Sequence, residues 1–305
     1  MIERPAPRRK ANDLSRVLNL TLAANERFPL DVEKVALEIS RAQCPTSPIT
    51  KVMGDDLPGL EGMLKQSKDG TKWAIVYNNS GSSPGRIRFT LAHEFGHYML
   101  HRQLQTLFEC SQQDMVDWDT LEKQIEGEAD TFASYLLMPL DDFRAQVNGH
   151  SISFDLLGHC ADRYGVSLTA AALKWLECSP NRAVLVASRD DRVVWARSNE
   201  RAYRSGACFA TTKRRYLVPQ QSVSHAANRN ATRQEGKQPA RVWFPREPEH
   251  MPLSELSFVS DNYDFTLTLL LMPDAEPRFI RDEEDDELLA PVDQVMRSDV
   301  CPGKR

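Results

Sequence analysis

Two histidines and a glutamate stand at a spacing that suits a hydrolytic metal centre. The run His93-Glu94-Phe95-Gly96-His97 lies within residues 86–101, where apolar side chains recur at helical intervals. Histidines four apart on a helix share one face, so His93 and His97 can bind one zinc ion at about 2.0–2.1 Å. Glu94 points about 100° around the helix, which suits a general base acting on water better than a co-ligand. The spacing therefore predicts a zinc site with Glu94 as its base.

Position 101 holds a further histidine, but its distance along the helix argues against a third ligand there. His93 and His101 are eight residues apart, about 12 Å along a helix axis. One ion does not reach both while His97 also binds, so we interpret His101 as a helix-end histidine that interacts with the C-terminal dipole. The longer pattern HExxHxxGxxH is missing as well, because position 103 is Gln103.

A second helix, predicted over residues 121–138, offers the third ligand that a catalytic zinc needs. Glu126 and Asp130 are four apart and share a face. We predict that Glu126 binds the metal and that Asp130 accepts the Nδ1–H of a ligand histidine, which fixes its tautomer. Glu128, about 200° around the helix from Glu126, is the alternative ligand.

The motif alone is weak, because short patterns of this kind arise by chance. The competing interpretation is a pair of buried structural histidines. Two features favour the metal site: the motif lies in a predicted helix, and a Glu-x-x-x-Asp helix follows about thirty residues later.

Short strands and helices are predicted around these two segments. A helix over residues 29–42 has Asp31 as its expected N-cap. The segments 49–53 and 73–77 are predicted strands, and 154–164 and 168–177 are predicted helices. Segment 73–77 could be a sheet edge that accepts an extended substrate or a core strand, and the two interpretations are equally open.

The composition changes near residue 180, where we place a domain boundary. The segments 183–187 and 193–196 flank a turn and predict a hairpin, and 242–244 and 265–271 are further predicted strands. Residues 221–240 are predicted to be a polar loop. We divide the chain into an N-terminal extension (1–29, loose or partly helical), a first domain (30–179), a strand-rich accessory domain (180–280) and an acidic tail (281–305).

The cysteine pattern and the lengths of the apolar segments indicate the compartment in which the protein works. The six cysteines are scattered without a CxxC pair, which argues against a cysteine-rich zinc site or a disulfide framework. The start of the chain has no secretory signal, and no apolar run is long enough to span a bilayer. We expect a cytoplasmic protein that does not associate with membranes.

Two long motifs in this order resemble the ImmA/IrrE family of metallopeptidases. They are RFTLAHEFGHYMLH (88–101) and IEGEADTFASYLLMP (125–139), preceded by GLEGML (59–64) and WAIVYNN (73–79). The resemblance covers about residues 30–178. It implies that this part is a compact α+β, zincin-like metallopeptidase domain with a short sheet, and we therefore expect an α+β protein in which this domain precedes the strand-rich accessory domain. It also implies that His93, His97 and Glu126 hold Zn²⁺, that Glu94 is the base, and that the substrate is a protein such as a helix-turn-helix repressor.

Two other functions compete with a peptidase. Residues 156–177 could form a helix-turn-helix for DNA, but the second helix is apolar with Lys174 as its one basic residue, which favours a packing pair. We therefore expect no direct binding of nucleic acid. A zinc-stabilised interaction module without catalysis is the other alternative, against which the intact Glu94 argues.

Overall fold

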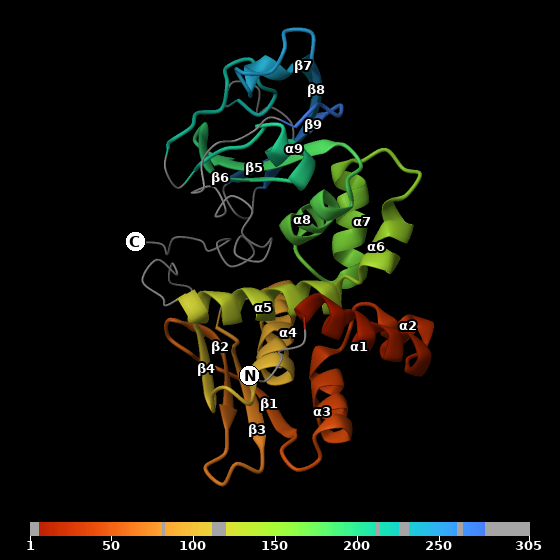
Figure 1. The fold of residues 1–305 in the computed structure, drawn as a ribbon, viewed down its shortest axis with the longest axis vertical. Coiled ribbons are helices and arrows are strands. Elements are labelled where there is room, and N and C mark those ends of the chain that lie inside the picture. Colours follow the sequence, from red (N-terminus) through yellow and green to blue (C-terminus); the bar gives the residue numbers. More distant parts are fainter. Residues whose placement is uncertain are drawn as a thin grey trace. The chain divides into compact units, whose positions relative to one another are not determined.

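The computed structural model describes residues 6–80, 83–111, 120–211, 214–225, 232–260 and 265–277. They form two compact units, each with its own sheet (Figure 1). The first unit comprises the described residues up to Gln146 together with His159–Leu168. The second comprises Val147–Gly158 and the described residues from Thr169 onward. The predicted acidic tail lies outside the described residues. The α+β class is confirmed, with a second unit that is rich in strands.

The sheet of the first unit has four strands in the order β1-β3-β2-β4. β1 (Ile49–Asp55) runs parallel to β3 (Trp73–Asn78), and β2 (Leu60–Gln66) is antiparallel to both β3 and β4 (Leu107–Ser111). β3 therefore lies inside the sheet, with Trp73 and Ile75 buried. The interpretation of residues 73–77 as a core strand is confirmed, and the interpretation as a sheet edge is wrong. Among the described strands of this sheet, β1 and β4 are the edges.

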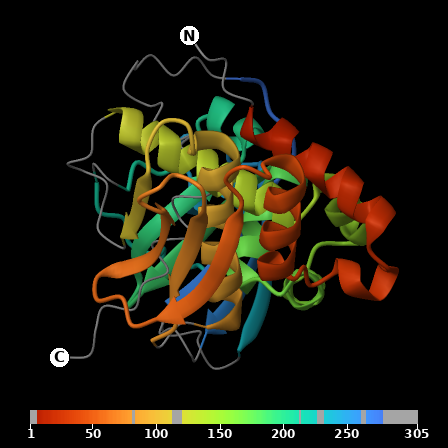
Figure 2. The same ribbon diagram turned by 90° about the horizontal axis from the view of Figure 1, so that it is seen from below.

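Helix α4 (Pro84–His101) packs against β2 and β3 across one face of this sheet (Figure 2). The Ser83 hydroxyl accepts the Arg86 N–H at 3.3 Å and caps the start of the helix. Helix α5 (Thr120–Leu137) packs on α4, and both were predicted from their apolar periodicity. The helices approach each other closely at Gly96, where a Cβ atom would lie 3.1 Å from the Ala129 carbonyl oxygen.

The N-terminal segment contains more helix than the sequence predicted. α1 (Pro7–Thr21) and α2 (Ala24–Arg27) precede α3 (Val32–Gln43), and α1 packs against α5. Ala11, Leu14 and Leu18 form a buried stripe on α1, which its many charged residues obscure in the sequence. The predicted cap of α3 is confirmed, because the Asp31 carboxylate accepts the Lys34 N–H at 3.0 Å.

Three helices connect the two sheets along the chain: α6 (Leu140–Val147), α7 (Phe154–Tyr164) and α8 (Leu168–Cys178). The predictions of α7 and α8 are confirmed. Lys174 of α8 is fully buried and faces Glu177 at 3.3 Å, so this helix does not present a polar face of the kind that reads DNA. No helix in the described part of the chain is long and apolar enough to cross a membrane.

The second unit has a five-stranded antiparallel sheet in the order β6-β5-β9-β8-β7. The predicted hairpin is confirmed by the pairing of its two strands, whose two-residue turn, Asp190-Asp191, has φ values of 48° and 56°. The prediction for 265–271 is confirmed by the last strand. The strands and the short helix of this unit are β5 (Arg182–Arg189), β6 (Arg192–Ser198), α9 (Glu200–Arg204), β7 (Arg233–Pro239), β8 (Pro252–Ser260) and β9 (Phe265–Met272).

Two predictions in this unit are wrong. Residues 242–244 are not a strand: a 3-10 helix covers Ala240–Val242, and Trp243 and Phe244 after it both point into the core. The polar stretch 221–240 is not one loop, because its last part is β7. That strand has almost no apolar side chains and is held by its backbone pairing with β8, so its sequence carries no strand pattern.

Candidate metal centre

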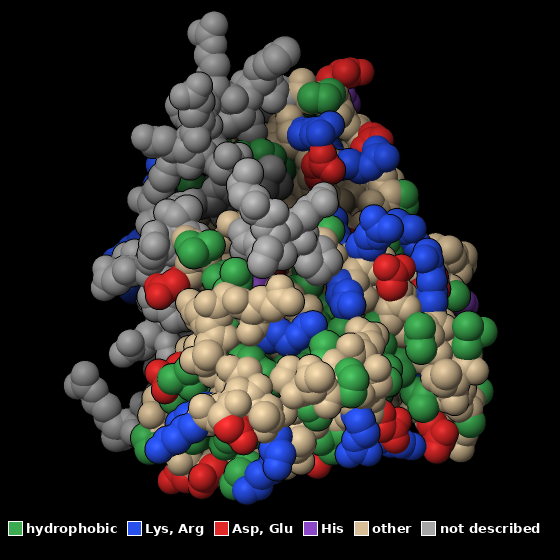
Figure 3. All heavy atoms as spheres, turned by 60° about the horizontal axis from the view of Figure 1, so that its bottom comes forward, with side chains coloured by type: hydrophobic (Ala, Val, Ile, Leu, Met, Phe, Trp, Pro, Cys, Tyr) green, Lys and Arg blue, Asp and Glu red, His purple; other side chains and the backbone are tan. Residues whose placement is uncertain are grey.

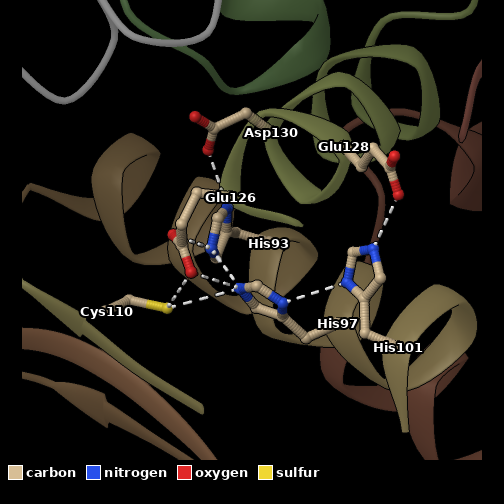
Figure 4. Close-up of polar contacts among 7 residues, drawn as sticks. All are labelled: His93, His97, His101, Cys110, Glu126, Glu128 and Asp130. Atoms are coloured by element: carbon tan, nitrogen blue, oxygen red, sulfur yellow. Dashed lines mark hydrogen bonds and ion pairs between the residues drawn. The ribbon is translucent and has the colours of Figure 1, made fainter. Parts of the chain in front are cut away.

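Four side chains from three elements meet beside the HExxH helix (Figure 4). They are His93 and His97 of α4, Cys110 of β4 and Glu126 of α5, and their possible ligand atoms all lie within 4.8 Å of one another. The two histidine Nε2 atoms are 2.8 Å apart. The Glu126 carboxylate oxygens lie 3.2 Å from His93 Nε2 and 3.1 Å from His97 Nε2. All four side chains are buried.

A carboxylate behind His93 sets the orientation of that ring. Asp130 Oδ1 lies 2.7 Å from His93 Nδ1, and Asp130 is fully buried one helical turn after Glu126. An ionised carboxylate only accepts hydrogen bonds, so we assign the proton to Nδ1. His93 Nε2 then carries a lone pair directed toward His97 and Glu126.

A longer chain of contacts orients His97. Its Nδ1 lies 3.2 Å from His101 Nδ1, and His101 Nε2 lies 3.0 Å from Glu128 Oε2. Because the carboxylate of Glu128 accepts the Nε2–H of His101, His101 Nδ1 accepts the Nδ1–H of His97. Both Nε2 atoms of the HExxH histidines are then free of protons. His101 is thus buried between His97 and Glu128, which the interpretation as a simple helix-end histidine did not foresee.

The structure places Glu126, and not Glu128, among the donor atoms. Glu128 instead contacts His101 and also accepts the Gln124 side-chain amide at 2.8 Å. The two carboxylates therefore serve different histidines, as their separation of two residues on α5 requires.

These donors suit a divalent cation. Two imidazole lone pairs and a carboxylate face one another in a buried space, an arrangement that is repulsive unless a cation joins them. Burial lowers the pKa of His97 from 6.5 to about 4, although Glu126 acts in the opposite direction, so the His97 ring is neutral at pH 7. Tetrahedral zinc with bonds of about 2.0–2.1 Å separates its donors by about 3.3 Å. The separations of 3.1 and 3.2 Å between the carboxylate and the two imidazole nitrogens are close to that value, and the two nitrogens, at 2.8 Å, lie nearer to each other.

Glu94 occupies a space that a glycine leaves open. It is fully buried, and a Cβ atom added to Gly62 of β2 would lie 2.7 Å from Glu94 Oε1 and 2.7 Å from Thr90 Cγ2. Gly62 pairs directly with Cys110 in the β2–β4 ladder, so these two positions share one face of the sheet. Glu94 and the donor cluster therefore lie over neighbouring strands on the same side of the sheet.

Strand β4 brings two side chains to the centre that the sequence did not single out. Phe108 stacks on the His97 ring with a centroid distance of 4.6 Å, and Cys110 Sγ lies 3.6 Å from His97 Nε2. Alternate residues of a strand share a face, so one edge strand supplies both contacts. The segment is only five residues long, and nothing local in the sequence indicates which cysteine lies near the histidines.

Tyr98 lies away from the donor cluster. Its hydroxyl donates to the Ser47 carbonyl oxygen at 2.9 Å, and its ring packs edge-on against Trp73. It therefore supports the junction between α4 and the sheet.

The molecular face shown in Figure 3 has no continuous basic field. Lys and Arg side chains there are interspersed with Asp and Glu among the described atoms.

Comparisons with known proteins agree with this geometry. Residues 55–176 match the IrrE N-terminal-like domain, which is a peptidase family. Metallopeptidase ImmA from Bacillus subtilis (strain 168) is 30% identical over 89 residues, covering 28% of this chain and 47% of that protein. The match thus spans about half the length of that relative. All four donor residues lie within the matched range, and residues 55–176 of this chain are therefore similar to the ImmA/IrrE family of metallopeptidases where the candidate metal centre lies.

Proposed function

We propose that the chain is a zinc-dependent endopeptidase with a zincin-like catalytic domain. In this proposal His93, His97 and Glu126 hold the ion, Glu94 is the general base, and Asp130 orients His93. One observation carries the proposal: two imidazole nitrogens from the helix that also carries Glu94 converge with the Glu126 carboxylate, all within 3.2 Å of one another.

The side chains divide the chemistry between them. Bound zinc would supply Lewis acidity that polarises a peptide carbonyl and makes water more acidic. Glu94 accepts a proton from the attacking water and delivers it to the leaving amine. Asp130 keeps the proton of His93 on Nδ1, and Glu128 does the same for His97 through His101. Phe108 covers the His97 ring and excludes water from that side.

The proposed substrate is a protein segment in extended conformation. Among the described strands, β4 pairs only with β2, so its other edge has backbone groups that a peptide can meet by strand addition. The same strand carries Phe108 and Cys110, which places such a peptide close to the donor cluster. A cytoplasmic helix-turn-helix repressor is our proposed partner, and the similarity of residues 55–176 to the ImmA/IrrE family supports it.

Metal content tests the ligand assignment. We expect one equivalent of zinc in the purified wild type and strongly reduced zinc in His97→Ala and Glu126→Ala. Glu128→Ala serves as the matched control on the same helix and should retain the metal. Full zinc in Glu126→Ala, with loss in Glu128→Ala, would reverse the assignment.

Cleavage tests the base. Wild type and Glu94→Gln are incubated with purified helix-turn-helix repressors from the same genome, and products are identified by mass spectrometry. Glu94→Gln should keep its zinc and lose cleavage, because its amide cannot accept the proton. A regulator that acts by binding alone would relieve repression in cells equally well with either form.

A further inference from the structure

The zinc ligands proposed above leave one donor of the buried cluster unused. Cys110 Sγ lies 3.6 Å from His97 Nε2 and 4.0 Å from Glu126 Oε1, and its side chain is 3% exposed. Figure 4 shows the sulfur directed toward the space between these two ligands. The sulfur therefore lies where a fourth coordination position would be.

The distance from the sulfur to His97 agrees with coordination through sulfur. With bonds of about 2.3 Å to sulfur and about 2.0–2.1 Å to nitrogen, a tetrahedral zinc ion separates the two donor atoms by about 3.6 Å. The separation between Cys110 Sγ and His97 Nε2 has this value. The pairing of Cys110 with Gly62 holds the sulfur on the sheet face that carries Glu94.

We propose that Cys110 is a fourth protein ligand that closes the zinc site in its resting state. This inference rests on the proposed zinc site. A site with four protein ligands is of the closed, structural kind, whereas hydrolysis needs a position open to water. When the sulfur binds zinc, the thiol releases its proton. When the site opens, the sulfur takes up a proton again and water occupies the fourth coordination position.

The location of Cys110 suggests what opens the site. Among the described strands β4 lies at an edge of its sheet, and a peptide that pairs with β4 acts on the element that holds the sulfur. Substrate binding and ligand exchange would then be coupled through one strand, so that the enzyme is inactive until an extended segment occupies the edge.

X-ray absorption at the zinc edge tests the ligation directly. The full chain, loaded with one equivalent of zinc, should show one sulfur neighbour at about 2.3 Å beside nitrogen and oxygen neighbours at about 2.0–2.1 Å. Cys110→Ser should keep its zinc and lose the sulfur neighbour. Cys208→Ser, a matched change in the second unit, should leave the spectrum unchanged.

The outcomes separate this inference from the proposed function. Zinc bound by nitrogen and oxygen alone in the wild type overturns the role of Cys110 and leaves the endopeptidase proposal standing. A sulfur neighbour that persists in Cys110→Ser also overturns it. A wild-type protein that binds no zinc overturns both.

Binding of acetohydroxamate to the cobalt-substituted protein tests the closed state. If the open form is a tenth of the wild-type population, Cys110→Ser should bind this probe about tenfold more tightly, because closure lowers the apparent affinity by the open fraction. The visible absorption of cobalt reports the binding. Equal affinities in the two proteins would overturn the closed resting state.

Discussion

At the scale of single residues, the rings of His93 and His97 are oriented by different carboxylates. Asp130 contacts His93 directly at 2.7 Å, whereas Glu128 reaches His97 only through His101. A buried carboxylate that holds the tautomer of a ligand histidine raises its basicity, and its loss usually weakens metal binding. The two carboxylates, both on α5, should therefore differ in their effect on the metal.

Asp130→Asn should raise the zinc dissociation constant by about 10-fold to 100-fold, because the charge that supports His93 is removed. Competition with a chromophoric chelator measures this constant. Glu128→Gln is the matched control and should have the smaller effect, since it acts on His97 through a second ring. A larger effect of Glu128→Gln would contradict this ranking.

A substitution at Gly62 can displace the Glu94 side chain while Glu94 itself is retained. A methyl group at Gly62 would lie 2.7 Å from Glu94 Oε1, so Gly62→Ala must shift the carboxylate or the strand. We expect cleavage to fall about 10²-fold, as for a misplacement of a catalytic group by about 1 Å, while zinc content stays at one equivalent. Unchanged cleavage with a folded protein would show that the position of Glu94 does not limit the reaction.

The sequence alone predicted the site residues whose relative positions follow from their spacing within one helix. His93, Glu94 and His97 follow from spacing on one helix, and Glu126 and Asp130 follow from the same rule on the next. Cys110, Phe108 and the contact between His101 and Glu128 depend on how β4 and α5 meet α4. Such contacts between elements leave no periodic signal, which is why the sequence did not predict them.

At the scale of elements, the centre depends on how closely α4 and α5 approach each other. Gly96 lies between the two metal-site histidines, and a Cβ there would be 3.1 Å from the Ala129 carbonyl oxygen and 3.1 Å from Phe132 Cδ1. The backbone of α5 cannot move aside for the added Cβ atom as the end of a flexible side chain could. Distance between these helices therefore sets the distance from Glu126 to the histidines.

Gly96→Ala should separate the two helices, lower the free energy of unfolding by about 1–3 kcal/mol and weaken zinc binding. Denaturant unfolding and chelator competition measure the two effects. Gly158→Ala is the matched control, because Gly158 of α7 has no heavy atom within 4 Å of the added Cβ and should gain up to about 1 kcal/mol from helix propensity. Similar losses in both variants would mean that the close approach is not the cause.

The junction of α6 and α7 makes the stability of the first unit depend on pH. Asp142 of α6 accepts two hydrogen bonds from Arg163 at 2.9 Å and one from the Tyr164 hydroxyl at 2.6 Å. Burial acts to raise the pKa of Asp142, but the hydrogen bonds from Arg163 and Tyr164 outweigh it and bring the pKa below its ordinary value of 3.8. The carboxylate thus stabilises the fold fully above about pH 4, and less as pH falls through the folded-state pKa.

Asp142→Asn should lower the free energy of unfolding by about 1–2 kcal/mol at pH 7, allowing for partial screening by solvent. The difference from wild type should shrink as pH falls below about 4, where the wild-type carboxylate takes up a proton. Urea unfolding at a series of pH values measures it. A difference that is constant down to pH 2 would rule out the charge as its source.

Helices and strands were predictable where the local sequence has an apolar periodicity or a helix-capping residue. α3, α4, α5, α7, α8 and β9 carry apolar stripes or runs, and Asp31 marks a helix start. β2, β4 and β7 are short or polar and exist because a neighbouring strand completes their hydrogen bonds. Trp73 and Ile75 made β3 recognisable as a strand, but its interior place in the sheet follows only from the pairing of three other segments.

At the scale of the whole molecule, the two units are stabilised in different ways. In the first unit the proposed zinc ion would join α4, α5 and β4. In the second unit the buried Arg182 guanidinium lies 2.7 Å from Glu247 and also donates to Ser205 and to the Pro273 carbonyl oxygen. Loss of the metal and loss of this ion pair should therefore affect different parts of the chain.

Removal of zinc by a chelator should lower the melting temperature of the first unit selectively. An ion present at 1,000 times its dissociation constant adds about 4.1 kcal/mol to the stability of the unit that binds it. Scanning calorimetry with and without chelator should show one transition moving and the other remaining. A common shift of all the heat absorption would mean that the units unfold together.

Glu247→Gln provides the reciprocal test in the second unit. The change leaves the fully buried Arg182 without its charged partner, and breaking a buried pair in this way costs about 3–5 kcal/mol. The transition that is insensitive to the chelator should move down, while zinc content and the chelator-sensitive transition stay as in wild type. If the same transition responds to both treatments, the stabilities of the two units are coupled, and the metal centre cannot be treated as a property of the first unit alone.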